Sequence, residues 1–274
     1  MINTGPIGVF DSGYGGLTIL SEFRKALPEY DYLYLGDNAR APYGNRSFDV
    51  VYDFTLEAVN YLRNRGCKLV ILACNTSSAK ALRSIQQQEL KNMDPDFRVL
   101  GVIRPSTESI GEMSKTKHIG ILGTKGTIQS NSYAIELQKF FPELKVFQQA
   151  CPLWVPLIES NTHYSKPGKA VIKEDFNTLI SNHPEIDTVL LACTHYPILS
   201  SYLKELAGDK IRIISQGAIV AEKLKEYLNR HSGMDERLSK NGLCSYLTTE
   251  NADVFNRSAI NFLSMVVDSE QVCL

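Results

Sequence analysis

The segment Leu69-Val70-Ile71-Leu72-Ala73-Cys74-Asn75-Thr76 is the most informative in the chain, because a near-copy recurs as Thr188-Val189-Leu190-Leu191-Ala192-Cys193-Thr194-His195. Each copy is an apolar run of strand length that ends in Ala-Cys, followed by residues able to begin a helix. A thiol at the carboxyl end of a parallel strand lies where open α/β sheets bind their ligands. The helix N-terminus that follows favours thiolate, so we expect it to lower the pKa of each thiol. Two such thiols can face each other across a cleft.

A second pair of similar segments supports an internal duplication. Ile7 to Phe10 predicts a strand, Asp11 to Gly16 predicts a glycine-rich turn before a helix, and Lys117 to Thr127 has the same layout. The offset is close to that between the two cysteine segments, which indicates duplicated α/β units. A chance likeness between strand–turn–helix segments is the alternative. We expect an α/β fold of two pseudo-symmetric three-layer domains with mainly parallel sheets, and a site in the cleft between them.

The expected domain boundaries follow from the same pattern. The first domain comprises residues 1–103 together with 210–274 and carries the first cysteine segment, and the second comprises residues 104–209. The dipeptide Arg104-Pro105 interrupts the pattern and marks a crossover. Later in the chain, the pattern predicts a polar, flexible stretch over 231–242 and an edge strand over 243–249.

Composition excludes several classes of function. The chain has 274 residues, of which 43% are hydrophobic, enough for one large or two medium domains. Acidic and basic residues nearly cancel to a net charge of −1, and no run of Lys or Arg predicts a nucleic-acid or membrane surface. No apolar run reaches membrane-spanning length, and the first residues lack the pattern of a signal peptide. We expect a cytoplasmic protein with no nucleic-acid or membrane partner.

The six cysteines show neither paired zinc spacing nor a Cys-x-x-Cys motif. Without a secretory signal they are expected to be reduced thiols, and no metal site is predicted. Cys74 and Cys193 stand out because each ends a predicted strand. The other four fit the common role of a small buried hydrophobic residue: Cys67, Cys151, Cys244 and Cys273.

Polar loops follow the first two predicted strands. The turn that begins at Asp11-Ser12 has the layout of an anion-binding loop, but its spacing fits neither G-x-G-x-x-G nor a P-loop. A carboxylate repels phosphate, so Asp11 suits an amine ligand or a proton-accepting role, although Asp11 and Ser12 can equally cap the helix. In the second loop, Asp37 fits an Asx-turn, and Pro42-Tyr43-Gly44 fits either backbone donors for a carboxylate or a simple turn.

Two further polar residues stand out in the second half. Glu159 ends a rigid apolar segment that begins at Cys151, and it fits either a site carboxylate or an ordinary solvated glutamate. His195 follows Cys193 by two residues. It can hold that thiol as a thiolate, or it can be a structural or capping histidine.

The paired thiols suggest a specific chemistry. One thiolate can remove a proton from a carbon acid while the opposite thiol returns a proton to the other face of the planar intermediate. The two roles exchange for the reverse direction, which gives racemisation or epimerisation, and neighbouring groups such as Asp11 or His195 can relay the protons. The chain shows no flavin, nicotinamide or pyridoxal-lysine motif, so no cofactor is expected.

Together these motifs resemble those of the glutamate racemase family. The resemblance rests on Asp11-Ser12-Gly13 with Gly15-Gly16, Gly36-Asp37 through Pro42-Tyr43-Gly44, Ala73-Cys74-Asn75-Thr76, and Ala192-Cys193-Thr194-His195-Tyr196-Pro197, in the family's order over most of the chain. It implies a cofactor-independent interconversion of L- and D-glutamate that supplies D-glutamate for peptidoglycan. It also implies glutamate as the small-molecule substrate and a homodimer.

The resemblance further implies roles for individual residues. Cys74 matches the thiol that deprotonates D-glutamate, and Cys193 matches the one that acts on L-glutamate. The assisting and site-lining acids and bases match Asp11, His195, Asp37 and Glu159. The implied substrate contacts are Asp11, Ser12, Pro42, Tyr43, Gly44, Cys74, Asn75, Thr76, Thr124, Cys193, Thr194 and His195.

One segment departs from the family pattern, and three alternatives stay open. Ser215-Gln216-Gly217 stands where family members commonly carry an Asp-Ser pair, which bears on a helix start or on the packing of the C-terminal segment. An aspartate or other amino-acid racemase is one alternative, although aspartate racemases usually carry Glu at the position of His195. A non-catalytic small-molecule binding protein is the second, and a metal or redox protein that uses Cys74, Cys193 and His195 is the third.

Overall fold

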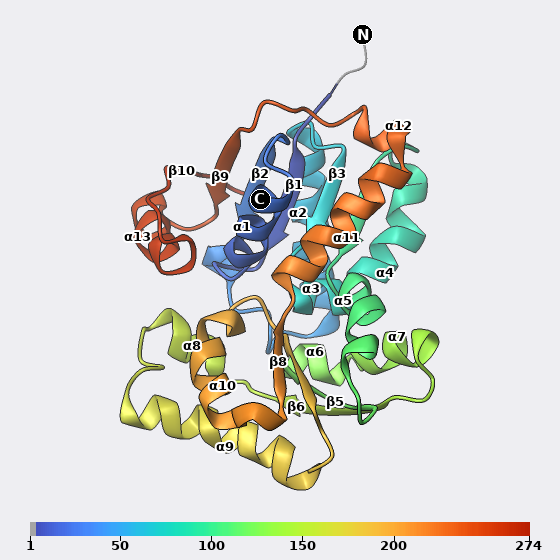
Figure 1. The fold of residues 1–274 in the computed structure, drawn as a ribbon. Coiled ribbons are helices and arrows are strands. Elements are labelled where there is room, and N and C mark those ends of the chain that lie inside the picture. Colours follow the sequence, from blue (N-terminus) through green and yellow to red (C-terminus); the bar gives the residue numbers. More distant parts are fainter. Residues whose placement is uncertain (1–3) are drawn as a thin grey trace.

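The computed structural model describes residues 4–274, and its strands form two separate parallel sheets (Figure 1). The larger sheet has the order β10-β9-β2-β1-β3-β4, and the smaller has the order β6-β5-β7-β8. Every pairing within both sheets is parallel. The strands are β1 Ile7–Asp11, β2 Tyr32–Gly36, β3 Leu69–Leu72, β4 Arg98–Gly101, β5 His118–Gly123, β6 Lys145–Ala150, β7 Thr188–Ala192, β8 Arg212–Ser215, β9 Cys244–Thr248 and β10 Ser269–Gln271.

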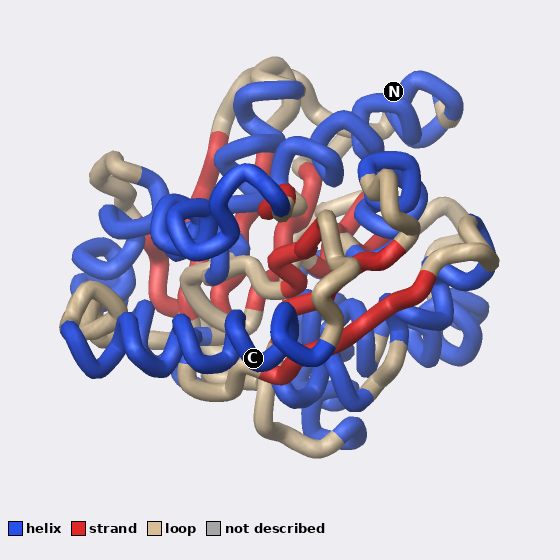
Figure 2. Tube along the Cα trace, turned by 60° about the horizontal axis from the view of Figure 1, so that its bottom comes forward, coloured by secondary structure: helices blue, strands red, loops and turns tan. Residues whose placement is uncertain are grey.

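Helices cover both faces of each sheet, so each half has three layers (Figure 2). Buried strands of this kind need apolar side chains on both faces, which explains their continuous apolar runs. The α-helices are α1 Gly16–Ala26, α2 Phe48–Asn64, α3 Asn75–Lys80, α4 Leu82–Ser84, α5 Ile103–Ile110, α6 Lys125–Gln129, α7 Ser132–Phe140, α8 Trp154–Glu159, α9 Lys166–Asn182, α10 Ser200–Ala207, α11 Gly217–Arg230, α12 Ser232–Asp235 and α13 Ala252–Leu263.

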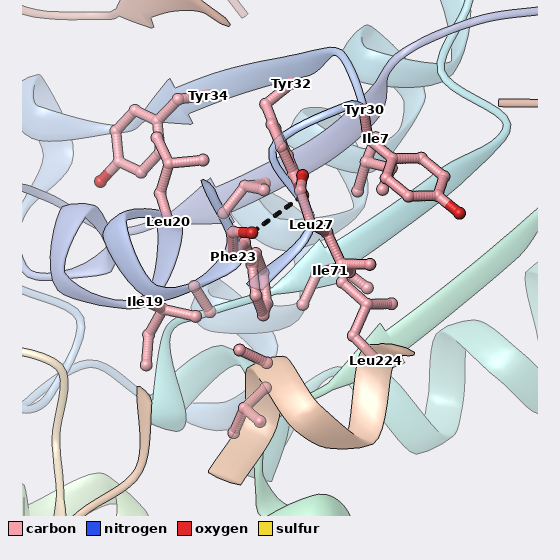
Figure 3. Close-up of a cluster of buried hydrophobic side chains, with 14 of the residues drawn as sticks. Ile7, Ile19, Leu20, Phe23, Leu27, Tyr30, Tyr32, Tyr34, Ile71 and Leu224 are labelled. Carbon is pink, nitrogen blue, oxygen red and sulfur yellow. Dashed lines mark hydrogen bonds between the residues drawn. The ribbon is translucent and has the colours of Figure 1, made fainter. Parts of the chain in front are cut away.

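Alternate residues of the larger sheet pack on opposite helical layers. Leu69 and Ile71 of β3 face the layer of α1, α11 and α13, whereas Val70 and Leu72 face the layer of α2. Figure 3 shows the first of these clusters, in which the Tyr32 hydroxyl also donates to the Leu27 carbonyl at 2.9 Å, at the end of α1. Both faces of β3 are therefore fixed by packing, and the residue that follows the strand has a defined position.

The smaller sheet has the same construction. Val189 and Leu191 of β7 pack in the cluster that includes α9 and α10, and Leu190 packs in the cluster that includes α5 and α7. The expected α/β fold with two parallel sheets is thus confirmed. The division into two domains stays a proposal, but its second boundary needs a shift, because β8 pairs with β7 and lies beyond the expected limit at residue 209.

Two expectations about local structure were wrong, and a third was right only in part. The dipeptide Arg104-Pro105 lies in the crossover from β4 of the larger sheet to β5 of the smaller, as expected. It does not interrupt the regular structure, however, because it lies in the first turn of α5, where a backbone N–H would have no partner within the helix. Strand β9 is not an edge strand, because β10 covers its outer side. Segment 231–242 is tied down rather than loose. It contains α12, and the backbone of Ser239 donates to Gly5 at 2.9 Å.

The interior position of β9 predicts a large stability difference between Leu247, within the strand, and Leu243, which immediately precedes it. Leu247 is 1% exposed and packs with Phe10 and Val272, whereas Leu243 is 63% exposed. Leu247→Ala should lower the free energy of unfolding by about 2–5 kcal/mol, as cavities in close-packed cores do. Leu243→Ala, the matched control, should change it by less than about 0.5 kcal/mol. Urea unfolding measures both, and equal losses would contradict this placement of β9.

Candidate active site

Both sequence-selected thiols lie just past the ends of equivalent central strands and line one pocket. Cys74 follows β3 and is the N-cap of α3, where the Ser77 amide donates to its Sγ at 3.5 Å. Cys193 follows β7 in the smaller sheet. The pocket between the two sheets is lined by Ser12, Gly13, Ala41, Pro42, Tyr43, Gly44, Asn45, Cys74, Asn75, Thr76, Thr124, Pro152, Val155, Pro156, Glu159, Cys193, Thr194 and His195.

Most of the residues expected at the site from the sequence are brought together here, but two acids are not in the lining. Asp11 and Asp37 are fully buried behind it. Sequence reasoning missed Gly13, Ala41, Asn45, Pro152, Val155 and Pro156. The rigid Pro-rich segment around Trp154 was a usable signal for the last three. No pattern in the sequence showed that it would pack against loops of the first half.

Asp11 lies buried behind the pocket and makes hydrogen bonds to both halves of the site. Its Oδ2 accepts from the Gly13 amide at 3.0 Å, and its Oδ1 accepts from the Thr194 hydroxyl at 3.3 Å, so it joins the two halves. Burial raises the pKa of Asp11 above its ordinary range, although the nearby His195 charge and the hydrogen bonds act in the opposite direction. Such a carboxylate takes up a proton more readily than an exposed one.

Asp37 organises the loop that presents Pro42, Tyr43 and Gly44. Its carboxylate accepts from Arg40 Nε at 2.6 Å, from the Thr249 hydroxyl at 2.8 Å and from the Tyr43 hydroxyl. These partners occupy both oxygens, and Asp37 has no exposed surface. The expectation that Asp37 lines the site therefore does not match its position: it shapes the wall rather than forming it.

Burial acts against the expected thiolate at Cys74. It raises the pKa of the Cys74 thiol to about 11, with a further increase from the charge of Asp11. The sequence suggested a lowered value from the following helix, but α3 has only six residues and its dipole is correspondingly weak. The Cys74 thiol is protonated at neutral pH, and it donates to Ser12 Oγ at 3.4 Å.

At His195, unlike at Cys74, hydrogen bonding outweighs burial in setting the direction of the pKa shift. Its side chain is 5% exposed, which alone would lower its pKa, but hydrogen bonds with Cys193 and Glu159 outweigh burial and raise the pKa to about 10. The imidazolium Nε2–H donates to Glu159 Oε1 at 2.9 Å. At neutral pH a positive charge thus lies beside the second thiol, while the first lies beside a carboxylate.

Hydroxyl and backbone contacts close the pocket across the two halves. Thr76 Oγ1 and Thr124 Oγ1 are 3.0 Å apart, and the Gly126 amide donates to the Gly44 carbonyl at 2.8 Å. The pocket has a cavity volume of about 30 Å³, which is room for one or two water molecules.

Within residues 4–274, no group of three or more His, Cys, Asp or Glu side chains is arranged to hold a metal ion. The described part of the chain also has no helix long and apolar enough to cross a membrane.

Comparison with known proteins agrees with this architecture. The family model for Asp/Glu/hydantoin racemases matches residues 18–224. Glutamate racemase 2 of Caldanaerobacter subterraneus subsp. tengcongensis is 35% identical over 266 residues, 96% of this chain and 95% of that protein. The crystal structure of glutamate racemase isoform RacE1 from Bacillus anthracis is similar with a TM-score of 0.86, at 34% identity and with 98% of each chain covered. That of Francisella tularensis subsp. tularensis glutamate racemase with D-glutamate has a TM-score of 0.84, at 29% identity and 98% coverage of each chain.

The chain belongs to the Asp/Glu/hydantoin racemase family. Its similarity over nearly full length places it with the glutamate racemases of that family, which makes it an enzyme of the isomerase class.

The hydrogen bonds of His195 to Cys193 and Glu159 predict a pKa well above the usual value for histidine. The imidazole should stay protonated from pH 6 to 9 and lose its proton near pH 10, and Glu159→Gln should move that midpoint downward. Because the folded-state pKa lies above the unfolded value, the pairing stabilises the fold at neutral pH, and this contribution is lost as pH rises through about 10. Imidazole NMR signals measure the titration.

Glu143→Gln is the matched control, because Glu143 is an exposed surface carboxylate paired with Lys117. It should leave the His195 midpoint unchanged. A His195 midpoint near 6.5, the usual value, in the unaltered protein would contradict the ion pair.

The surroundings of Gly15 show how closely the two halves approach each other. A Cβ at Gly15 would lie 2.3 Å from Thr194 Oγ1 and 2.4 Å from His195 Nδ1, although its φ of −59° suits any residue. Gly15→Ala should therefore displace both groups and lower turnover by a factor on the order of 100, while the fold is retained. At Gly233 a Cβ meets nothing within 4 Å, so Gly233→Ala is the control. Unchanged racemisation by Gly15→Ala would show that this approach is not required.

Proposed function

We propose that this chain interconverts L- and D-glutamate by moving the Cα proton between Cys74 and Cys193, without a cofactor. The observation that carries the proposal is that two thiols at equivalent strand ends of two similar sheets line one small pocket. Inversion at carbon needs an acid and a base on opposite faces of a planar intermediate. Residues contributed from two facing half-sites suit that requirement.

The surroundings of the thiols support a division of labour. The protonated Cys74 is ready to deliver a proton, so the resting state suits the direction in which Cys193 first deprotonates L-glutamate. The imidazolium of His195 stabilises negative charge on Cys193. For the reverse direction Cys74 must first lose its proton, and Asp11 is the buried base whose charge already acts on that thiol.

The remaining lining residues suit a zwitterionic substrate with two carboxylates. Hydroxyls of Thr76 and Thr124, the Asn75 amide and the loop at Gly44 offer hydrogen-bond donors, and Glu159 offers an acceptor for the substrate ammonium group. Glutamate is favoured over aspartate because the curated relatives are glutamate racemases and a similar solved structure contains D-glutamate.

Several further expectations rest on this reaction. The product D-glutamate is proposed to enter peptidoglycan synthesis, and a reaction that uses two free thiols suits the reducing cytoplasm. All six cysteines are unpaired in the structure. The two-domain division, with its second boundary after Ser215, and the homodimer expected from the sequence stay proposals.

The decisive experiment follows the α-proton of glutamate by NMR in D₂O, with reductant and chelator present and no added cofactor. The unaltered protein should exchange the α-proton and bring the optical rotation of L-glutamate to zero, and L-aspartate should react far more slowly. Cys74→Ala and Cys193→Ala should each abolish racemisation, because the cycle needs both thiols. The control Cys273→Ala removes an exposed thiol and should retain full activity.

The outcomes separate the competing functions. An untouched α-proton on both amino acids would favour a binding protein. Near-normal turnover by either active-site alanine variant would contradict the two-thiol mechanism. Loss of activity in chelator alone would favour the metal alternative.

A further inference from the structure

A closed circuit of buried hydrogen bonds joins Asn75, the residue after Cys74, to Gln216 and Tyr133. The Gln216 amide donates to the Tyr133 hydroxyl, and the Tyr133 hydroxyl donates to Asn75 Oδ1. The Asn75 amide completes the circuit by donating to Gln216 Oε1 at 2.7 Å. Gln216 and Asn75 are each 2% exposed and Tyr133 is 0% exposed, so water does not compete for these bonds. Such a satisfied polar network fixes the orientation of every member.

Ser106 sets the direction of the circuit. Its hydroxyl donates its single proton to the Val102 carbonyl at 2.7 Å, so it can only accept from Gln216 Nε2, which lies 2.8 Å away. The amide nitrogen of Gln216 must therefore face Ser106 and Tyr133, and its oxygen must face Asn75. One N–H of the Asn75 amide is used by Gln216, which leaves the second for the pocket that Asn75 lines.

The circuit spans both connections between the sheets. Ser106 lies on α5, in the segment that leads from β4 to β5, and Gln216 lies between β8 and α11, where the chain returns. Asn75 begins α3 beside the larger sheet, and Tyr133 lies on α7 beside the smaller. Figure 1 shows α5 between the two sheets, with α3 and α11 next to it, and α5 packs on α3, α7 and α11. Gln216 thus ties one thiol-bearing strand end to both crossovers.

We propose that Gln216 is a positioning residue for the two-thiol reaction: it holds the Asn75 amide and the start of α3, and hence Cys74, in register with the second half. The inference rests on the proposed function and names a residue that the reaction chemistry alone does not require. Cys74 is the N-cap of α3 and Asn75 is its first residue, so a shift of one moves the other. Cys193 follows β7, and among residues 4–274 no hydrogen bond joins its side chain to Gln216, Tyr133 or Asn75.

The test is Gln216→Met, which keeps the length of the side chain and removes its hydrogen bonds. Misplacement of a reacting group should lower kcat/KM by about 10- to 100-fold. Because the equilibrium constant of a racemisation is one, kcat/KM must fall equally for D- and L-glutamate in every variant. The rate loss alone therefore cannot show which thiol has moved.

Isotope effects distinguish the two thiols. With α-deuterated D-glutamate, the primary effect on kcat/KM arises when Cys74 removes the deuteron; with α-deuterated L-glutamate, it arises at Cys193. If Gln216→Met raises the barrier at Cys74, the effect with D-glutamate should increase and the effect with L-glutamate should fall toward unity. A merely structural defect lowers the active fraction and leaves both isotope effects as they are in the unaltered protein.

Two further variants, one in the same circuit and one outside it, test this interpretation. Tyr133→Phe breaks the same circuit with the ring retained and should shift both isotope effects in the same directions, and the double variant should lose less than the product of the two single losses. Gln86→Met removes a glutamine whose amide donates to the Val99 carbonyl away from the pocket, and it should change neither rate nor isotope effects.

The results that would overturn the proposal are specific. Unchanged kcat/KM in Gln216→Met, or a loss with both isotope effects unaltered, would each refute it. If Gln216→Met does not fold, Tyr133→Phe decides by the same criteria. Failure of the unaltered enzyme to exchange the α-proton would instead refute the proposed function, so the two failures are distinguishable.

Discussion

The site depends on one constraint: the carboxyl ends of two separate parallel sheets must approach to van der Waals distance. The turn after β1 comes so close to the segment after β7 that no side chain larger than hydrogen fits at Gly15. The hydroxyl contact between Thr76 and Thr124 and the bond from Thr194 to Asp11 hold the same approach from other directions. Two thiols on distant parts of the chain can serve one substrate only because this gap is so small.

Closing the gap removes water, and the loss of water sets the charge pattern. A buried ionisable group keeps its charge only where a partner replaces the lost hydration. His195 has such partners in Cys193 and Glu159 and stays positive, whereas Cys74 lies next to Asp11 and stays a neutral thiol. The two half-sites have similar backbones but opposite electrostatics. A pseudo-symmetric fold thereby places a neutral thiol on one side and a positive charge beside the thiol on the other.

Buried polar contacts then hold the loops and helices around the pocket in place. The hydrogen bonds of the Asp37 carboxylate order the loop at Tyr43. Those of the Gln216 amide link Asn75 to both crossovers. Neither side chain lines the pocket. Their buried, fully paired state explains why polar residues occur at such depth, since an unpaired amide or carboxylate there would be costly.

The amino-acid sequence alone was enough to predict the parallel α/β architecture, the strand ends that carry Cys74 and Cys193, and most of the residues that line the pocket. Periodicity and internal repetition are local signals, and chain order alone brings the residues after central strands to one edge of a sheet. Sequence could not show that β10 covers β9, that Asp37 turns away from the pocket, or that burial outweighs the helix at Cys74. Each of these depends on which surfaces meet and how much water they exclude. Only the tertiary structure decides such contacts, because their partners lie far apart along the chain.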